Sequence, residues 1–148
     1  GEAVSVQYTY FGKPYLYNEK QRQHVSITHS GDYSAVIINP HTSVGIDIEE
    51  VSRRIERVAP RFLSEEELLF MDKNSFLEHL TICWTAKEAL FKISGNDYYD
   101  FREQIKLLPF DFSHQGTIRA VLSGENNRAD VRLQFEKIED YYLSYVVC

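Results

Sequence analysis

Two acidic side chains within one short apolar segment are the first candidates for chemistry in this sequence. Residues 45–49 read Gly-Ile-Asp-Ile-Glu, and in a β-strand the residues two apart lie on the same face. Asp47 and Glu49 would therefore point the same way, with Ile46 and Ile48 opposite. Neighbouring carboxylates repel each other unless a cation or water separates them, and Mg²⁺ prefers hard oxygen ligands of this kind. The alternative is an ordinary solvated face of an edge strand.

A lysine inside an apolar helix is the second candidate. On a helical wheel, residues 75–94 are apolar over most of the circumference, which predicts a buried helix. Glu88 and Lys92 lie on a narrow polar arc, whereas Lys87 falls inside the apolar arc. Burying a lysine is costly unless it finds a partner, water or a cavity. The ordinary interpretation is a surface Glu88–Lys92 pair with Lys87 extending to solvent.

The histidines show no spacing typical of a zinc site, and the sequence has no Cys-x-x-Cys motif. Four of them are expected on the surface or in loops: His24, His41, His79 and His114. His29 differs because it follows a predicted strand and precedes a turn, where binding groups often lie. A purely structural role for His29 is the alternative.

Short strands on both sides of a helical stretch must position these groups. Strands are predicted for residues 3–11 (half-buried), 25–28, 33–38, 43–48, 116–123, 129–137 and 141–147. Helices are predicted for residues 51–61 and 75–94. A loop is predicted for residues 17–23, and irregular structure for residues 97–112. Residues 39–41 favour a hairpin between the strands that flank them. Ser64 and Glu67 predict a capping box, and Gly95 predicts the end of the long helix. The pattern favours an α+β fold, with an antiparallel sheet packed against a long buried helix.

The composition limits the class of protein. The 148 residues are 43% hydrophobic and 14% aromatic, which is enough for one domain with a core and excludes a disordered chain. The net charge of −6 argues against a general nucleic-acid binder. No apolar run approaches the roughly 20 residues that cross a membrane, and the start does not read as a signal peptide. Two cysteines are too few for a disulfide scaffold. We therefore expect a single cytoplasmic domain over residues 1–148, without nucleic-acid or membrane partners.

Two segments together resemble the paired signature of the 4′-phosphopantetheinyl transferases. Residues 44–49 and 84–92 match [V/I]-G-[V/I]-D, a gap, and [W/F]-x-x-K-E-[A/S]-x-x-K, with 41 positions from Asp47 to Glu88. The fold expected from this resemblance is the 4′-phosphopantetheinyl transferase-like α+β fold. Shorter matches favour the surfactin-synthetase-activating branch over the short holo-acyl-carrier-protein synthase branch; they lie at residues 12–14, 27–31, 61–67 and 142–148.

The resemblance implies an enzyme that transfers the 4′-phosphopantetheine arm of coenzyme A to a serine of an apo carrier protein. The reaction of that family, holo-[acyl-carrier-protein] synthesis, is Mg²⁺-dependent and releases adenosine 3′,5′-bisphosphate. By residue-to-residue transfer, the Mg²⁺ ligands would be Asp47, Glu49 and Glu88. The groups that contact coenzyme A would be Lys13 near the 3′-phosphate, and Thr28, His29, Lys87 and Lys92 at the other phosphates. The remaining catalytic roles would be activation of the serine by Glu67, directly or through water, and assistance to the leaving group by Lys92.

A basic strip is the candidate docking surface for an acidic carrier protein. It consists of Arg53, Arg54, Arg57 and Arg61, with Phe62 as a possible apolar anchor. The alternative is an ordinary charged helix face that is neutralised by Glu56 and by the acidic residues 65–67.

The length of the chain is the main difference from the family pattern. Surfactin-type enzymes consist of two similar halves with the site between them, and here residues 1–30 resemble the end of the first half and residues 31–148 the second. A second copy of the chain could complete the cleft, as in the trimeric short branch. The alternative function is that of a non-catalytic remnant that binds coenzyme A or a carrier protein.

Overall fold

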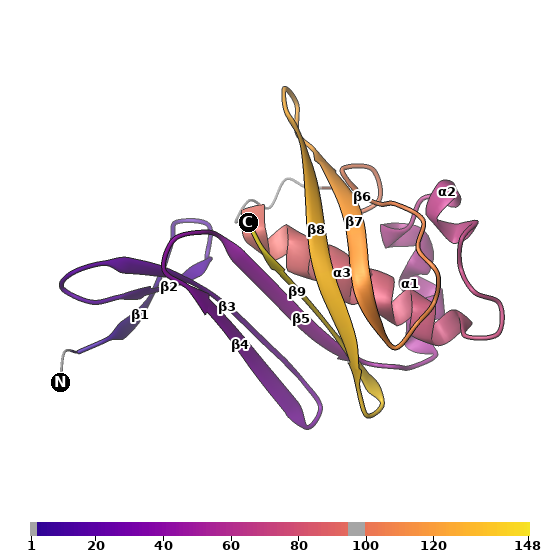
Figure 1. Cartoon of the computed structure of the whole chain (residues 1–148), viewed down its shortest axis with the longest axis horizontal. Coiled ribbons are helices and arrows are strands. Elements are labelled where there is room, and N and C mark those ends of the chain that lie inside the picture. The colour runs from indigo at the N-terminus through magenta and orange to yellow at the C-terminus, as the bar shows by residue number, and fades with distance from the viewer. Residues whose placement is uncertain (1–2, 95–99) are drawn as a thin grey trace.

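The computed structural model describes residues 3–94 and 100–148, and these form two antiparallel sheets and three helices (Figure 1). The first sheet has the order β1 (Ser5–Tyr8), β2 (Pro14–Tyr17), β3 (Arg22–Ser30) and β4 (Tyr33–Asn39). The second has the order β5 (Val44–Glu50), β9 (Tyr141–Val147), β8 (Arg128–Ile138), β7 (Gln115–Ser123) and β6 (Ile105–Leu107). The helices are α1 (Arg54–Phe62), α2 (Glu65–Leu68) and α3 (Phe76–Ser94). The expected α+β class is therefore confirmed.

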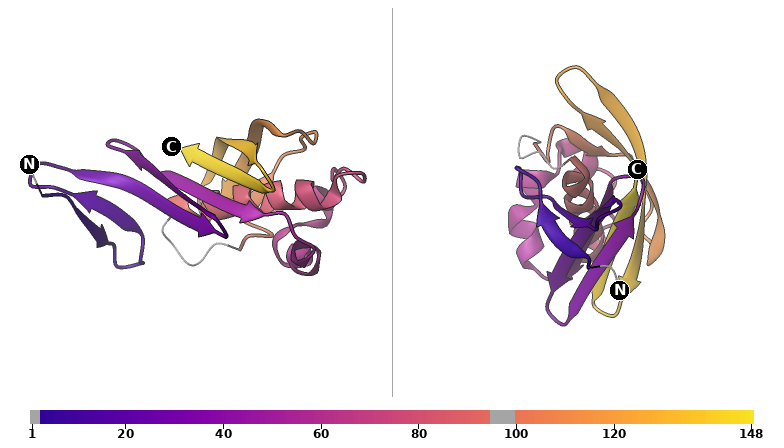
Figure 2. Two further views of the ribbon diagram at one scale, coloured as in Figure 1. Left: turned by 90° about the horizontal axis from the view of Figure 1, so that it is seen from below. Right: turned by 90° about the vertical axis from the view of Figure 1, so that its left-hand side faces the viewer.

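The long helix α3 crosses one face of the second sheet, and α1 and α2 lie at the end away from the first sheet (Figure 1). Figure 2 shows the first sheet projecting away from the helices, with the N-terminus at its far end. Leu80, Ile82, Cys83 and Leu90 of α3 are fully buried in the main core. The prediction of a long buried helix against an antiparallel sheet is confirmed, because apolar side chains surround most of this helix.

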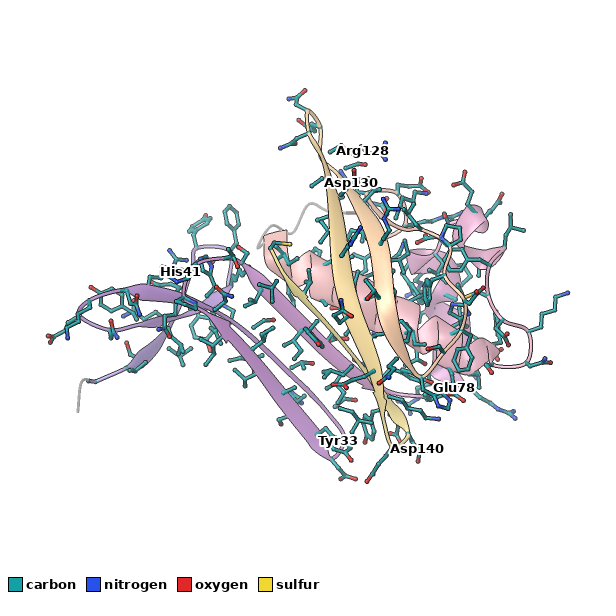
Figure 3. The ribbon with its side chains drawn as sticks, viewed as in Figure 1. Tyr33, His41, Glu78, Arg128, Asp130 and Asp140 are labelled. Atoms are coloured by element: carbon teal, nitrogen blue, oxygen red, sulfur yellow. The ribbon has the colours of Figure 1, made fainter. Side chains whose placement is uncertain are left out.

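The start of α3 is fastened to the second sheet by a polar contact. Glu78 Oε2 accepts hydrogen bonds from Lys137 Nζ at 3.1 Å and from the Tyr142 hydroxyl at 2.5 Å. Glu78 is labelled in Figure 3, close to the lower end of the sheet. Since both partners belong to the segment from β8 to β9, this contact fixes the orientation of α3 across the strands.

Side-chain hydroxyls join the two sheets where β3 lies beside β5. Ser26 Oγ accepts a hydrogen bond from Ile46 N at 3.1 Å, and Thr28 Oγ1 accepts one from Ile48 N at 3.3 Å. The residue numbers increase together along both strands, so β3 and β5 run parallel at this seam. The backbone N–H groups of β5 that do not face β9 are thereby satisfied without a regular strand ladder.

The two faces of the first sheet differ strongly in burial. Tyr33, Ala35 and Ile37 of β4 pack against apolar side chains of β5 and β9 on the second sheet. The strand register places five other apolar side chains together on the opposite face of this sheet, and each of them is 42–65% exposed: Val6, Tyr8, Ile27, Val36 and Ile38. We call these five residues the exposed apolar face.

Several local predictions were wrong. β4 pairs with β3, and β5 pairs with β9, so residues 39–41 do not connect a hairpin. The two-residue turn follows β3 instead, where Gly31 has a φ of +52° that glycine adopts readily. The strand predicted for 3–11 is exposed rather than half-buried, the loop predicted for 17–23 is shorter because β3 begins at Arg22, and β6 interrupts the segment expected to be irregular. Gly95 lies outside the described residues.

In the part of the chain that the structure describes, no helix combines the length and apolar character needed to cross a membrane.

Candidate functional site

Asp47 lies on β5 at the seam between the two sheets and is 5% exposed. Its Oδ1 accepts hydrogen bonds from Thr28 Oγ1 at 3.1 Å and from Lys92 Nζ at 3.2 Å. Its Oδ2 is buried, and among the described residues it has no hydrogen-bond partner. Ile46 and Ile48 pack in the cluster between the sheets, as expected for the face of β5 opposite Asp47.

Three carboxyl groups repel one another at this point. Burial raises the pKa of Asp47 from 3.8 to about 6, with a further contribution from Glu49, although Lys92 opposes the shift. Burial and the neighbouring Asp47 raise the pKa of Glu88 from 4.5 to about 7. Glu49 Oε2 also accepts a hydrogen bond from Ser30 Oγ at 3.3 Å. The structure therefore brings together the three acidic residues that the sequence singled out, and their ionised forms oppose one another.

These carboxylates fit a divalent cation in charge and chemistry. Within residues 3–94 and 100–148, no three His, Cys, Asp or Glu side chains are already placed as a group that could hold a metal. The unpartnered Oδ2 of Asp47 and the mutual repulsion with Glu88 are nevertheless what a cation would relieve. Hard oxygen donors of this kind suit Mg²⁺.

Close packing of α3 on β5 brings Glu88 and Lys92 to Asp47. A Cβ atom on Gly45 would lie 1.9 Å from the carbonyl oxygen of Ala89, so only glycine permits this approach. Lys92 Nζ then donates hydrogen bonds to the carbonyl oxygens of Ile46 at 2.8 Å and Ile27 at 3.3 Å. One ammonium group therefore connects α3 to both strands of the seam, next to the carboxylates.

Lys87 and Glu67 form a fully buried ion pair instead of facing the carboxylate cluster. Lys87 Nζ is 2.7 Å from Glu67 Oε1 and also donates to the carbonyl oxygens of Phe62 at 2.6 Å and Phe101 at 2.7 Å. These contacts use all three donors of the ammonium group. Burial lowers the pKa of Lys87, and Glu67 opposes the shift. The expected contact between Lys87 and substrate phosphates is therefore not supported by this arrangement.

Both oxygens of Glu67 are also occupied. Oε1 accepts from Ser64 N at 2.9 Å, which completes the predicted capping box at the start of α2, and Oε2 accepts from Leu107 N at 2.9 Å. Glu67 is 2% exposed. A carboxylate held in this way fixes three chain segments together, and the role of Glu67 in activating a serine, directly or through water, stays a prediction.

Thr28 and His29 lie on opposite faces of β3, because side chains alternate along a strand. Thr28 is buried against Asp47, whereas His29 is exposed on the same side as Ile27. Lys13 lies near the end of α3, where its Nζ donates a hydrogen bond to the carbonyl oxygen of Ile93 at 2.7 Å. It lines a cavity of about 220 Å³ that Arg22 and His24 also line. The four basic groups expected at coenzyme A thus lie in four places: Lys13 at this cavity, His29 on the exposed side of β3, Lys87 in the buried ion pair and Lys92 beside Asp47.

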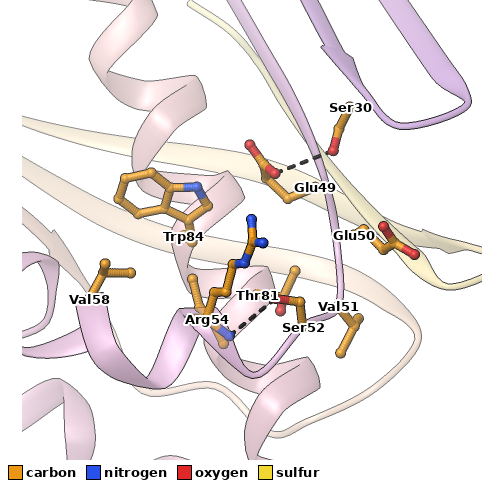
Figure 4. Close-up of a pocket in the computed structure, with 10 residues that line it drawn as sticks. Ser30, Glu49, Glu50, Val51, Ser52, Arg54, Val58, Thr81 and Trp84 are labelled. Carbon is orange, nitrogen blue, oxygen red and sulfur yellow. Dashed lines mark hydrogen bonds between the residues drawn. The ribbon is translucent and has the colours of Figure 1, made fainter.

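A larger cavity of about 640 Å³ opens on the other side of Glu49 (Figure 4). Its walls come from the end of β5, from α1 and from α3. Figure 4 shows Arg54 extending from α1 between Trp84 and Glu49. Ser30 at this cavity was not singled out as a site residue in the sequence, and Arg54 was expected only as part of the basic strip. The alternation of hydroxyl residues at 26, 28 and 30 was the signal for Ser30, since all three hydroxyls hydrogen-bond to residues of β5.

The basic strip forms, but without its apolar anchor. Its four arginines are exposed on or next to α1: Arg53, Arg54, Arg57 and Arg61. Phe62 is 1% exposed, and its ring centroid lies 4.9 Å from that of Trp84. The prediction of Phe62 as a surface anchor was therefore wrong, because the helix turns this side chain into the core.

His79 is a further correction. It lies on α3 and is 0% exposed, with its Nδ1 accepting a hydrogen bond from Asp72 N at 3.0 Å. Aromatic rings surround it: Phe70, Phe110 and Phe112. A surface position was expected, but the imidazole caps the turn before α3 from within the core. His41 and His114 are exposed as predicted, and His24 is half-buried in β3.

Comparisons with known proteins agree with the sequence motifs. A family model described as the 4′-phosphopantetheinyl transferase superfamily matches residues 43–146. The 4′-phosphopantetheinyl transferase gsp of Aneurinibacillus migulanus is 32% identical over 92 residues, which cover 60% of this chain and 37% of that protein. A Haemophilus influenzae protein that is provisionally named a 4′-phosphopantetheinyl transferase is 33% identical over 122 residues, covering 72% of this chain and 49% of that protein.

A solved structure gives a weaker likeness. The crystal structure of Thermotoga maritima holo-[acyl-carrier-protein] synthase superposes with a TM-score of 0.48 at 22% identity, covering 70% of this chain and 61% of that one. The chain matches less than half the length of each of the two curated relatives. The family model nevertheless spans both motifs and most of the chain. The chain therefore belongs to the 4′-phosphopantetheinyl transferase superfamily.

Proposed function

We propose that this chain transfers the 4′-phosphopantetheine arm of coenzyme A to a serine of an apo carrier protein, with release of adenosine 3′,5′-bisphosphate. The observation that carries the proposal is the cluster of Asp47, Glu49 and Glu88 beside Lys92, in which burial raises the pKa of Asp47 and of Glu88. Three carboxylates alone would repel a diphosphate. Their presence next to an ammonium group therefore supports a site that binds a phosphate-containing substrate together with a cation.

The chain's own residues supply charge and orientation in this proposal. Asp47, Glu49 and Glu88 would hold Mg²⁺, and the ion when bound would neutralise charge on the diphosphate. Lys92 lies beside this position and would stabilise charge on the departing phosphate. Thr28 orients Asp47 through the hydrogen bond to its Oδ1. We do not assign Glu67 as the base, since it would have to leave Lys87 and Leu107 to reach a serine.

The smaller basic cavity is the proposed position of the nucleotide end of coenzyme A. Lys13 is near the end of α3 and shares that cavity with Arg22 and His24. These groups carry or can gain positive charge, which suits a 3′-phosphate. We propose that Lys13 contacts this end of the substrate and that His29, which faces elsewhere, does not act together with Thr28.

The exposed arginines of α1 remain the proposed docking surface for an acidic carrier protein. A second copy of the chain that completes the cleft is also part of the proposal, and the five apolar side chains of the exposed apolar face, each 42–65% exposed, offer a surface for it. Cys83 and Cys148 are both free thiols, and free thiols suit a reducing compartment. On that basis we propose a cytoplasmic location.

The second candidate function is binding of coenzyme A or a carrier protein without turnover. It is favoured by one observation, namely that the matched segment spans only 37% and 49% of the two curated relatives. The retained carboxylates and Lys92 favour the transferase, since a protein that only binds a carrier protein has no need of a cation site.

One assay separates these functions. The chain is incubated with apo carrier protein, coenzyme A and Mg²⁺, and the added arm is detected as a mass increase of the carrier protein. The transferase predicts an Mg²⁺-dependent increase that Asp47→Ala and Glu88→Ala abolish. Mg²⁺-dependent binding of coenzyme A without transfer would support the second candidate. Absence of both transfer and binding would refute both.

A further inference from the structure

A pair of hydroxyl groups is buried next to the carboxylate cluster, and the proposed function does not use it. Thr85 on α3 and Ser144 on β9 are both 0% exposed, and their side-chain oxygens are 2.8 Å apart. Thr85 Oγ1 also donates a hydrogen bond to the carbonyl oxygen of Ile82 at 3.0 Å. Because a hydroxyl group carries one proton, Ser144 is then the donor between the two oxygens. The hydroxyl pair therefore ties the middle of α3 to the middle of β9.

Each member of the pair has a proposed cation ligand as its neighbour. Ser144 is the cross-strand partner of Asp47 in the β5–β9 register, so their Cβ atoms lie about 5 Å apart on one face of the sheet. Thr85 precedes Glu88 by three positions on α3, and residues three apart are neighbours on a helix surface. Asp47 Oδ2 is buried there, and no described residue supplies it with a hydrogen bond. The pair thus crosses the same space between helix and sheet that separates the two carboxylates.

The hydroxyl pair completes the placement of α3 over the second sheet. On the β5 side, the close approach of Ala89 to Gly45 limits how near the helix can lie. On the β9 side, the hydrogen bond between Thr85 and Ser144 fixes the distance. With one contact on each strand, the helix cannot tilt away from β9 or slide along the sheet without losing one of them.

The length of this contact matters because a cation site tolerates little change. A methyl group in place of the Thr85 hydroxyl would contact Ser144 Oγ no closer than about 3.5 Å, so α3 would move away from β9 by roughly 0.7 Å at this point. Mg²⁺ requires oxygen ligands at about 2.0–2.1 Å in nearly octahedral geometry. Ca²⁺ accepts oxygen ligands at about 2.3–2.6 Å in flexible geometry. A wider gap between helix and sheet would therefore weaken Mg²⁺ binding more than Ca²⁺ binding.

On the basis of the cation site in the function proposed above, we propose that Thr85 and Ser144 are positioning residues that favour Mg²⁺ over Ca²⁺. Neither residue is a ligand of the cation. Their hydrogen bond acts through the backbones of α3 and β9, and it sets the separation between Asp47 and Glu88.

The test uses Thr85→Val, Ser144→Ala and the double variant. Binding of Mg²⁺ and of Ca²⁺ is measured separately, from the increase in the free energy of unfolding in urea as the cation concentration rises. Each single variant should bind Mg²⁺ about tenfold more weakly and Ca²⁺ less than about threefold more weakly. Thr85→Ser keeps the hydroxyl group and should bind both cations like the unmodified protein.

The double variant shows whether the two residues act as one unit. A single contact can be removed only once, so the double variant should lose no more Mg²⁺ affinity than either single variant. Losses that multiply to about a hundredfold would indicate two independent effects and would overturn the proposal. Equal losses of Mg²⁺ and Ca²⁺ affinity would also overturn it, since a purely structural role has no reason to distinguish the cations.

Thr81→Val is the matched control. This threonine is also buried, lies one turn earlier on α3, and donates its hydroxyl proton to the carbonyl oxygen of Leu77 in the same helix. It should leave both cation affinities unchanged, and a loss equal to that of Thr85→Val would contradict the proposal. If neither cation stabilises the unmodified chain, the cation site of the proposed function fails and this inference fails with it. If the unmodified chain binds Mg²⁺ and Thr85→Val binds it equally well, only this inference fails.

Discussion

Replacing Asp47 with asparagine should stabilise the cation-free protein while removing its response to Mg²⁺. The carboxyl group has an ordinary pKa of 3.8 and a folded-state pKa of about 6. Each unit corresponds to 1.36 kcal/mol, so the ionised form opposes folding by about 3 kcal/mol at pH 7.5. The asparagine keeps an oxygen for Thr28 but places an amide group at the unpartnered Oδ2 position. That amide costs about 1–2 kcal/mol, which leaves a net gain of roughly 1–2 kcal/mol.

The pH dependence has a definite sign. Because the folded protein binds the proton on Asp47 more tightly than the unfolded chain does, the contribution of Asp47 to stability falls as the pH rises from about 4 to about 7. The advantage of Asp47→Asn therefore grows over that range, and at pH 5 about half of the opposing 3 kcal/mol is present. Removal of the negative charge also lessens the repulsion on Glu88, whose pKa Asp47 raises.

The assay is urea unfolding at pH 5 and pH 7.5 in EDTA and then with Mg²⁺. The matched control is Glu50→Gln, an exposed carboxylate at the end of the same strand, which should change the unfolding free energy by less than about 0.5 kcal/mol. Mg²⁺ should stabilise the unmodified protein by mass action and leave the variant unchanged. If the variant is no more stable than the unmodified protein at pH 7.5 in EDTA, or gains more at pH 5, the electrostatic account of the cluster is wrong.

Three further outcomes are expected. Glu67→Gln should lower the free energy of unfolding, measured in urea, by about 3–5 kcal/mol because Lys87 stays buried without a countercharge. The control is Glu66→Gln at an exposed position. A loss below about 1 kcal/mol for Glu67→Gln would contradict the role of the buried pair. Burial lowers the pKa of His79 against the opposing effect of Asp72 and Asp111, so the contribution of His79 to stability should rise with pH up to about 6.5. His79→Gln should remove this contribution, so that its unfolding free energy, measured from pH 5 to pH 7, falls more steeply with pH than that of the unmodified protein. Val36→Lys on the exposed apolar face should reduce self-association in light scattering, whereas Leu69→Lys, outside that face, should not; equal effects would argue against an interface there.

The motifs located the carboxylate cluster, and the structure shows why they could. The glycine at position 45 is a local requirement of close packing, since a side chain there would collide with Ala89. Asp47 and Glu49 share a face because of strand geometry. Glu88 and Lys92 follow from the helical repeat. Each of these relationships depends on neighbours in sequence or on a single packing contact, so spacing alone was informative.

The partners of Lys87 and Phe62 could not be predicted in the same way. The helical wheel showed that Lys87 needed a partner, but Glu67 is 20 residues away and reaches it only through the packing of α2 against α3. Phe62 follows the basic strip in sequence, yet the last turn of α1 directs it into the core. The hairpin predicted at residues 39–41 failed for a related reason, because β5 pairs with β9, which lies almost a hundred residues later.

The sequence by itself determined the family, the α+β class and the carboxylates that repel one another. Those features rest on short-range periodicity and on two motifs whose residue types have a direct chemical meaning. The tertiary structure decided which lysine lies at the carboxylate cluster and which is paired in the core. Lys92 lies against Asp47, whereas the ammonium group of Lys87 donates its hydrogen bonds to Glu67 and to the carbonyl oxygens of Phe62 and Phe101. The physical reason is that a buried ammonium group binds whichever oxygens the packing of separate segments brings within reach, and no sequence spacing specifies that arrangement.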